Sequence, residues 1–319
     1  MKYSGGFFII CFTTGGILFM QDNLEKFLNL VTQKSALQNK YIKKYLPNLT
    51  AQEIEDLKQL IGFYEFLGYS IEDIAEYYLF FVERIIMEET KYFVEHGTYR
   101  YSTFKEVSSD VYFNDLFMTK YMIGLGVSTY LWSHHLNGLR FFINFISSVK
   151  GENYLEIGPG HGEYFTKALK YSNLKFFHAV HLSESSVKLT KQYVDYCKLG
   201  GGGGQVCIEN KNFFEFTPSV KYDVIVMGEV LEHVEEPLKF LRQIAKCSTE
   251  KTKSYVTTVV DAPTPDHIYH FRSPEEIFNM AESAGFKILE YKLFTPNNKP
   301  IEKVKKLHEA IWVGMILSL

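Results

Sequence analysis

The sequence is poor in the features that mark secreted, nucleic-acid-binding and membrane-spanning proteins. Its cysteines are scattered without a CxxC pair, so neither a disulfide framework nor a metal site of paired thiols is expected; they are Cys11, Cys197, Cys207 and Cys247. No long basic run occurs, and 34 Lys and Arg stand against 37 Asp and Glu. Nucleic acid is therefore not an expected partner, because phosphate binding needs concentrated positive charge.

A long apolar run is missing as well. Phe7 to Phe19 is nearly apolar, but it holds 13 residues and is interrupted by Thr13 to Gly16. A membrane-spanning helix needs about 20 residues, so no stable membrane span is expected, and we expect a cytoplasmic protein. Residues 1–20 are assigned to an N-terminal extension whose role stays open: a signal peptide, a strand packed on the protein, or a segment upstream of a start at Met20.

Aromatic residues, in contrast, are abundant, with 22 Tyr and 27 Phe, many of them before residue 150. Helical periodicity runs from Asp22 to about Val149. Thr50–Glu53 and Ser70–Asp73 are capping-box patterns, and the apolar stripe after Ser70 predicts a long amphipathic helix that ends at His96-Gly97. The stretch from Tyr112 onward predicts two or three buried helices. Residues 21–149 are therefore expected to form an all-helical, aromatic-rich domain.

From residue 150 the pattern changes to short strands separated by helices. The expected strands are Tyr154–Ile157, Phe176–Leu182, Gln205–Ile208, Tyr222–Met227, Tyr255–Val260, Phe286–Phe294 and Ile311–Leu317. The expected helices are Glu163–Tyr171, Glu184–Cys197, Pro237–Ala245 and Pro274–Ala284. This alternation predicts an α/β fold, a doubly wound, Rossmann-like, mostly parallel seven-stranded sheet. Only a charged connection, Pro296–His308, joins the last two strands, so we expect the last strand to be antiparallel.

The sharpest motif, EIGPGHG at residues 156–162, lies between the first expected strand and the next helix. Glycines there allow a tight turn and a close approach of the backbone to a ligand. A Rossmann dinucleotide site would use G-x-G-x-x-G, whereas the spacing here is G-x-G-x-G. Glu156 stands two positions before the first glycine, where it can pair with a cationic ligand and would be unfavourable beside a pyrophosphate.

On this motif the chain resembles the class I S-adenosylmethionine-dependent methyltransferases. Within them it looks most like the small-molecule branch that includes quinone-biosynthesis methyltransferases. The resemblance covers Gly151 to Leu319 and implies a methyltransferase domain at residues 150–319 with S-adenosylmethionine as cofactor. It also implies that four motif residues surround the amino-acid part of the cofactor: Glu156, Gly158, Gly160 and Gly162.

Further matches follow the second and third expected strands. The family places an acidic residue after strand two, where it accepts hydrogen bonds from both ribose hydroxyls. This chain has His181, followed by Leu182, so the ribose contact is altered or Glu184 takes it over. After strand three, Asn212 stands where the family reads the adenine amino group, with Phe213 beside the ring. The alternative for Asn212 is an ordinary turn residue.

The segment GEVLEHV after strand four is the second strongest match. The resemblance implies that Gly228, Glu229 and Val230 pass under the cofactor and that His233 borders the reaction site. The alternative for His233 is a histidine bonded to backbone at a helix start. After strand five, His267 and His270 could hold or deprotonate a substrate hydroxyl, or belong to a structural loop pinned by prolines. No metal site is expected, since these acids and histidines lack a recognisable ligand spacing.

The predicted reaction is methyl transfer to an O, C or N atom of a small, apolar or aromatic metabolite. His233, His267 and His270 are the candidate bases. The helical domain is expected to cap the substrate pocket or to form a homodimer, and a small molecule is the only other expected partner. The alternative function is a catalytically silent cofactor-binding scaffold, for which the absent acid at position 181 is the sole support.

Overall fold

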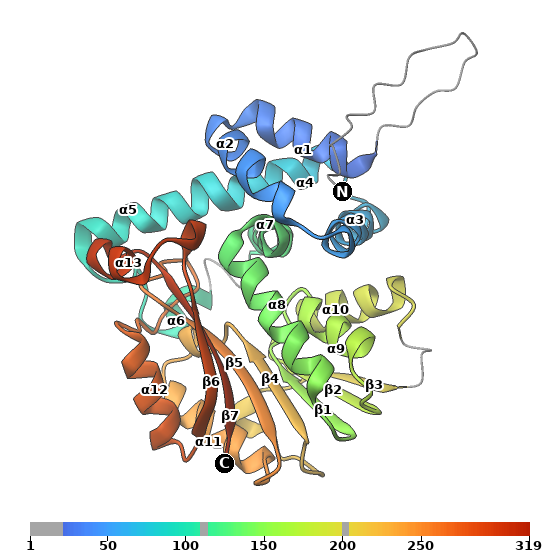
Figure 1. The fold of residues 1–319 in the computed structure, drawn as a ribbon, viewed down its shortest axis with the longest axis vertical. Coiled ribbons are helices and arrows are strands. Elements are labelled where there is room, and N and C mark those ends of the chain that lie inside the picture. The colour runs from blue at the N-terminus through green and yellow to red at the C-terminus, as the bar shows by residue number, and fades with distance from the viewer. Residues whose placement is uncertain (1–21, 109–113, 200–203) are drawn as a thin grey trace, which may run out of the picture.

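The computed structural model describes residues 22–108, 114–199 and 204–319, so the expectations for residues 1–20 lie outside the described residues. Figure 1 shows two parts: a twisted sheet with helices on its faces, and a group of N-terminal helices at one end of it. Within the described ranges, no helix has both the length and the apolar character needed to cross a membrane.

Seven strands form one sheet in the order β3-β2-β1-β4-β5-β7-β6. They are β1 Asn153–Ile157, β2 Phe176–His181, β3 Gln205–Asn210, β4 Val224–Gly228, β5 Lys253–Val260, β6 Lys287–Phe294 and β7 Ile311–Ser318. The pairs among β1 to β5 are parallel, whereas β7 runs antiparallel to both β5 and β6. The predicted fold class, with its antiparallel last strand, is therefore confirmed.

Two helical layers cover the sheet. The layer on one face consists of α8 Ser133–Ser148, α9 Glu163–Tyr171 and α10 Glu184–Tyr196, and the layer on the other consists of α11 Pro237–Cys247 and α12 Pro274–Ser283. Alternate residues of each inner strand enter the two cores, so Tyr154 packs in the first core and Leu155 in the second.

The N-terminal part is helical, as predicted. Its elements are α1 Asn23–Lys34, α2 Ala36–Tyr45, α3 Ala51–Phe66, α4 Ile71–Leu79, a π-helical segment Phe80–Ile86, α5 Met87–His96, α6 Phe104–Val107 and α7 Asp115–Leu131. Both predicted capping boxes form, Thr50 with Glu53 and Ser70 with Asp73. The long helix predicted after Ser70 does reach His96, where Gly97 caps it in the left-handed conformation.

The core of the helical part is continuous with one core of the sheet. Phe27 and Tyr64 belong to the same buried cluster as Phe165 and Tyr255. A buried charge network crosses the same junction: Lys167 Nζ on α9 lies 3.0 Å from Asp56 Oδ2 on α3. The helical part and the sheet therefore share one continuous core, although the sequence pattern changes at residue 150.

The same network reaches the glycine motif through Glu163, the first residue of α9. Lys167 Nζ lies 3.5 Å from Glu163 Oε2, and the Tyr130 hydroxyl of α7 donates to Glu163 Oε1 at 2.6 Å. Removing one partner of such a network would leave an uncompensated buried charge, which is strongly destabilising. The helical part thus holds the start of α9, and with it the glycine motif, in place.

One helix lies where the sequence indicated only a charged connection. Between β6 and β7 the chain forms α13, Ile301–Leu307, which buries Val304 in the second core. The helix is only seven residues long and four of them are charged, so it is too short for an apolar periodicity to be recognised.

Candidate active site

A cavity of about 1090 Å³ lies where β1, β2, β4 and β5 end, beside α7 and α8. Ligands of open α/β folds gather at this carboxyl edge of the sheet. The cavity is lined on one side by the glycine motif and the strand ends, and on the other by Met118, Tyr121, Met122, Leu125, Trp132 and His134. Pockets for drug-sized ligands enclose roughly 300–1,000 Å³, so this cavity has room for a cofactor together with a small acceptor.

The glycine motif brings main chain to the cavity wall. Gly158 and Gly160 have φ angles of 69° and 57°, a region that glycine enters without strain. The Gly158 N–H donates to the carbonyl of Val180 at 2.9 Å, which ties the turn to β2. A Cβ on Gly160 would lie 3.6 Å from Met122 Cε and 4.0 Å from the Gly158 carbonyl oxygen, and so would project into the cavity without a clash. Gly162, in contrast, caps α9 and does not line the cavity.

Glu156 lies at the end of β1, 2% exposed, and accepts a hydrogen bond from the Tyr154 hydroxyl. Burial raises the pKa of its carboxyl to about 8, against the lowering effect of that hydrogen bond. A buried carboxylate beside open space is stabilised by a cation. The amino group of S-adenosylmethionine is such a cation, so Glu156 and the open face of Gly160 fit the amino-acid part of the cofactor.

His181 lines the cavity in a defined tautomeric state. Its Nδ1 accepts a hydrogen bond from the Ser183 N–H at 2.8 Å, so the hydrogen of the neutral ring is on Nε2. Burial lowers the pKa of His181 to about 4, with the nearby His233 as a second cause, which keeps the ring neutral. A ribose hydroxyl would therefore meet a donor here instead of the two acceptors of a carboxylate. Leu182 lies beside it on the cavity wall.

Asn212 lines the cavity, but local bonds engage its amide. Its Oδ1 accepts from the Phe214 N–H at 3.1 Å, and its Nδ2 donates to Glu215 Oε1 at 3.3 Å. This is the turn-capping arrangement that the sequence left open as an alternative. Phe213 is buried and lines the cavity, so it is placed to pack against an aromatic base.

Gly228 ends β4, Glu229 and Val230 follow it, and all three line the cavity. Glu229 has a left-handed φ of 53°, which strains the backbone. Two hydrogen bonds offset this strain: its N–H donates to the Thr257 carbonyl and to Thr257 Oγ1, both at 3.1 Å. A Cβ on Gly228 would lie 2.5 Å from the ring of Tyr164, so that ring fits only against glycine. Burial raises the pKa of Glu229 to about 7.

Three side chains with potential ligand atoms meet at the end of β4: Glu232, His233 and His267. The His233 Nδ1 contacts the Asp266 carbonyl at 2.9 Å, and the His267 Nδ1 contacts the Ala262 carbonyl at 2.6 Å. A carbonyl can only accept, so each Nδ1 bears the hydrogen and each Nε2 is left as an acceptor.

Glu232 was not among the expected site residues. Its side chain is fully buried, and Oε2 accepts from Thr258 Oγ1 at 2.7 Å, whereas Oε1 has no hydrogen-bond partner among the described residues. Oε1 lies 4.0 Å from the Nε2 atom of His233 and 4.0 Å from that of His267. Burial and the neighbouring Glu229 carboxyl raise the pKa of Glu232 well above its usual range. The three groups could hold a proton or a divalent cation between them.

The structure places two of the three expected histidines at the cavity and the third outside it. Both His233 and His267 border the cavity, and burial lowers the pKa of His267 to about 3. His270 does not line the cavity, since its Nε2 lies 2.7 Å from Asp261 Oδ1 and its ring packs against Phe93 and Tyr99. As a base, His270 is the candidate with the least support.

An aromatic wall of Trp132, His134 and Trp312 lines the cavity, and of these residues Trp312 was missed by sequence reasoning. Trp312 comes from β7 and Trp132 from the junction of α7 and α8, and the His134 ring lies at centroid distances of 3.8 Å from Trp312 and 5.3 Å from Trp132. Trp312 stands in no motif, and only the antiparallel insertion of β7 beside β5 brings it to this place.

A family defined by a methyltransferase domain matches residues 131–291, about half of the chain. The chain is similar to a ubiquinone biosynthesis O-methyltransferase of Nitrosospira multiformis, 25% identical over 207 residues that cover 58% of this chain and 83% of the relative. It is also similar to a protein of the same description from Coxiella burnetii, 24% identical over 178 residues, or 49% of this chain and 73% of the relative.

Among solved structures, mitomycin 7-O-methyltransferase MmcR shares the fold with a TM-score of 0.52 at 13% identity, covering 78% of this chain and 70% of that one. This share is larger than residues 150–319 supply, so the common fold includes part of the helical region. The matching domain, the order of the strands and the glycine motif agree with one another. The chain belongs to the class I S-adenosylmethionine-dependent methyltransferases.

Proposed function

We propose that the chain transfers the methyl group of S-adenosylmethionine to a hydroxyl oxygen of a small, flat and largely apolar metabolite. The observation that carries this proposal is that one cavity extends from the glycine motif to the wall of Trp132, His134 and Trp312. Cofactor and acceptor can therefore meet within one cavity. The O-methyltransferase descriptions of the similar proteins favour oxygen over carbon or nitrogen as the acceptor atom.

The aromatic wall supports a flat acceptor that has a polar substituent. Large aromatic side chains favour stacking partners. His134 is only 4% exposed, and neither of its ring nitrogens has a hydrogen-bond partner among the described residues. Burial lowers the pKa of His134 well below its usual range, so the ring is neutral and offers one donor and one acceptor. A hydroxyl or carbonyl group on the acceptor would satisfy one of them.

The cofactor supplies an electrophilic methyl group, and the residues of the chain align the acceptor and remove its proton. Because a sulfonium charge disappears during transfer, a pocket closed to water suits the reaction. His233 is the base we assign: it lines the cavity, its side chain is 20% exposed, and its Nδ1–H is held by the Asp266 carbonyl. That hydrogen bond directs Nε2 to act as the proton acceptor.

The unpaired Glu232 oxygen favours a second route to the same product. A divalent cation held by Glu232, His233 and His267 would polarise the acceptor hydroxyl in place of an imidazole base. Chelation separates the routes: turnover that resists a strong chelator supports the histidine base. Turnover that chelation abolishes and Mg²⁺ or Mn²⁺ restores supports the cation.

The test of the proposed function is turnover with matched acceptors. Hydroxylated aromatic compounds and the corresponding amines are incubated with S-adenosylmethionine, and the methylated product is identified by mass spectrometry. The proposal expects O-methylated products and a loss of roughly 10²–10⁴ in kcat for His233→Ala, with cofactor affinity nearly unchanged. His270→Ala is the matched control and should retain most activity. Exclusive N-methylation would contradict a hydroxyl oxygen as the acceptor atom. Cofactor binding without any turnover would favour a catalytically silent scaffold.

A further inference from the structure

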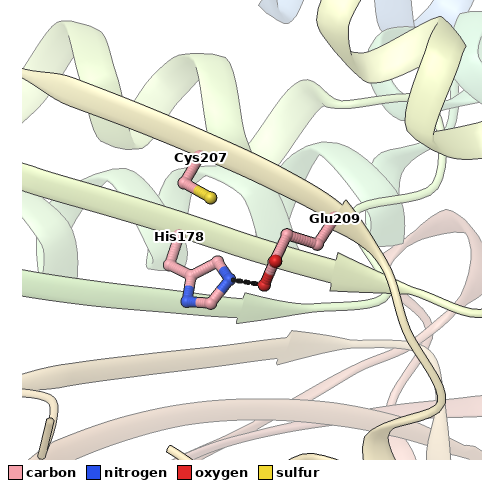
Figure 2. A group of neighbouring side chains, drawn as sticks. All are labelled: His178, Cys207 and Glu209. Atoms are coloured by element: carbon pink, nitrogen blue, oxygen red, sulfur yellow. Dashed lines mark hydrogen bonds and ion pairs between the residues drawn. The ribbon is translucent and has the colours of Figure 1, made fainter. Parts of the chain in front are cut away.

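A second group of potential metal ligands lies outside the cavity, on the edge of the sheet. His178 on β2 and Cys207 on β3 are paired residues of two adjacent parallel strands, and Glu209 follows two positions later on β3. Paired residues and residues two apart share one face of a sheet, so all three side chains project to the same side. Figure 2 shows them together on that face.

The ligand atoms of these residues are already close. Nε2 of His178, Sγ of Cys207 and a carboxylate oxygen of Glu209 all lie within 4.8 Å of one another. His178 Nε2 and Glu209 Oε2 are 2.8 Å apart (Figure 2). Metal–ligand bonds of about 2.0–2.3 Å in a tetrahedron imply ligand atoms roughly 3.3–3.8 Å apart. Small side-chain rotations would therefore produce a coordination shell without a change of backbone.

Tyr222 and Phe216 hold the His178 ring in an orientation that suits metal binding through Nε2. Its Nδ1 lies 2.7 Å from the hydroxyl of Tyr222, which is itself buried, and its ring packs against Phe216. A phenol hydroxyl can accept a hydrogen bond as well as donate one, so it permits the tautomer with the hydrogen on Nδ1. Without metal, Nε2 lies 2.8 Å from Glu209 Oε2 and donates to it, because a carboxylate only accepts. In the tautomer with the hydrogen on Nδ1, the Nε2 lone pair is instead available to a metal between Cys207 and Glu209. Partners of this kind orient histidine ligands in known metal sites.

We propose that His178, Cys207 and Glu209 form a zinc site with a fourth position open to solvent. Nitrogen, sulfur and oxygen donors together suit Zn²⁺, and a thiolate plus a carboxylate balance its two charges. On binding, the Cys207 thiol releases its proton to solvent and sulfur forms the bond to zinc. His178 Nε2 loses to solvent the hydrogen that it donates to Glu209, while Nδ1 takes one up from solvent and donates it to the Tyr222 hydroxyl, so the ring stays neutral. No electron transfer occurs. Lys211 Nζ, now 3.4 Å from Glu209 Oε2, gives way to the metal. Cys207 is exposed, so zinc can enter directly.

The site would join the two strands just before they reach the cofactor cavity. Asn210, next to Glu209, donates through Nδ2 to the carbonyls of His181 and Leu182 at 3.1 and 2.8 Å. Zinc would add a metal link to the backbone pairing between β2 and the edge strand β3, which has no other neighbour among the described strands. Metal binding to the folded state raises the melting temperature by mass action. This proposal does not depend on the acceptor or on the base.

The test uses Co²⁺ in place of Zn²⁺ on the full-length protein treated beforehand with a chelator. Cobalt bound to a thiolate gives a near-ultraviolet charge-transfer band, which the cavity group of Glu232, His233 and His267 cannot produce, because it has no sulfur. We expect one equivalent of Co²⁺ with this band, displaced by Zn²⁺. Tyr222→Phe should weaken binding by roughly 10–100-fold while the band remains.

Cys207→Ser is the decisive variant, because its exposed side chain makes a folding defect unexpected. It should abolish the band and lower bound zinc by one equivalent, with circular dichroism and cofactor binding unchanged. Cys197→Ser is the matched control and should keep the charge-transfer band and the bound zinc. Absence of the band in the wild-type protein, or its persistence in Cys207→Ser, would overturn the site. A cation in the cavity would survive Cys207→Ser and be lost in His267→Ala.

Discussion

The two ends of the cavity are built in different ways. The cofactor end is mainly backbone: glycines with positive φ, a turn bonded to β2, and a left-handed Glu229 whose N–H is fixed by Thr257. The acceptor end is made of side chains that come from α7, α8 and β7. The first end therefore depends on conformation and the second on side-chain identity. Substitutions should accordingly affect binding of the cofactor and choice of the acceptor separately.

The largest effect is expected from removing the helices that hold both ends together. A chain that starts at residue 148 loses the aromatic wall of α7 and α8 and the partners of Lys167 and Glu163, and it exposes a wide apolar face. It should be poorly soluble or bind cofactor weakly. Light scattering and calorimetric titration measure this, with a chain that starts at Asp22 as control. A soluble fragment with full affinity would show that the sheet builds the site alone.

The next effect concerns the backbone end alone. Gly160→Val should weaken S-adenosylmethionine binding by about tenfold or more, because the added side chain enters cavity space. The left-handed φ also costs roughly 1–2 kcal/mol of stability. Gly97→Val controls for this, since Gly97 has a similar φ of 72° and open space around its Cβ, away from the cavity. Equal affinities of the two variants would mean that the glycine motif does not contact the cofactor.

A smaller effect is expected from pH. The folded-state pKa values of Glu156 and Glu229 are raised to about 8 and about 7 by burial, so their contribution to stability is lost as pH rises through that range. Those of His181 and His267 are lowered to about 4 and about 3, so their contribution is lost as pH falls below about 6.5.

The melting temperature of the cofactor-free protein should therefore fall by a few degrees between pH 6.5 and pH 8.5. Each kcal/mol shifts it by roughly 2–4 °C in a domain of 150–250 residues. Glu156→Gln should flatten this dependence, and S-adenosylmethionine should do so in the wild type, because its cation stabilises the ionised carboxylate. A melting temperature that rises through this interval would contradict the assignment.

The smallest effect is expected at the ribose. In His181→Asp a carboxylate can accept from both hydroxyls, so cofactor affinity should be equal or up to about tenfold tighter. Calorimetric titration at neutral pH measures it. Asp can also accept from the Ser183 N–H, which keeps the local turn. A large loss of affinity in a folded variant would show that the Nε2–H donor of His181 has a role of its own.

The sequence predicts the cofactor end of the cavity better than the acceptor end. The glycine motif and the GEVLEHV segment are contiguous, so their residues and their place at the strand ends could be predicted. Glu232 and His267 come together only because the loop after β5 folds back, with the Ile268 and Tyr269 N–H groups donating to the Glu232 carbonyl. Trp132 and Trp312 are brought together by the strand order. No local pattern encodes such contacts, so a cap of aromatic-rich helices could be expected but the contribution of β7 to the acceptor end could not.

The position of β7 has a consequence for biosynthesis. Among the described residues, strand β6 pairs only with β7, and β7 also covers the side of β5 that would otherwise be an open edge. Until a ribosome has released Ile311–Ser318, the nascent chain presents one unpaired strand and one exposed edge, which are hazards for aggregation. The sheet can therefore close only after this strand has been translated.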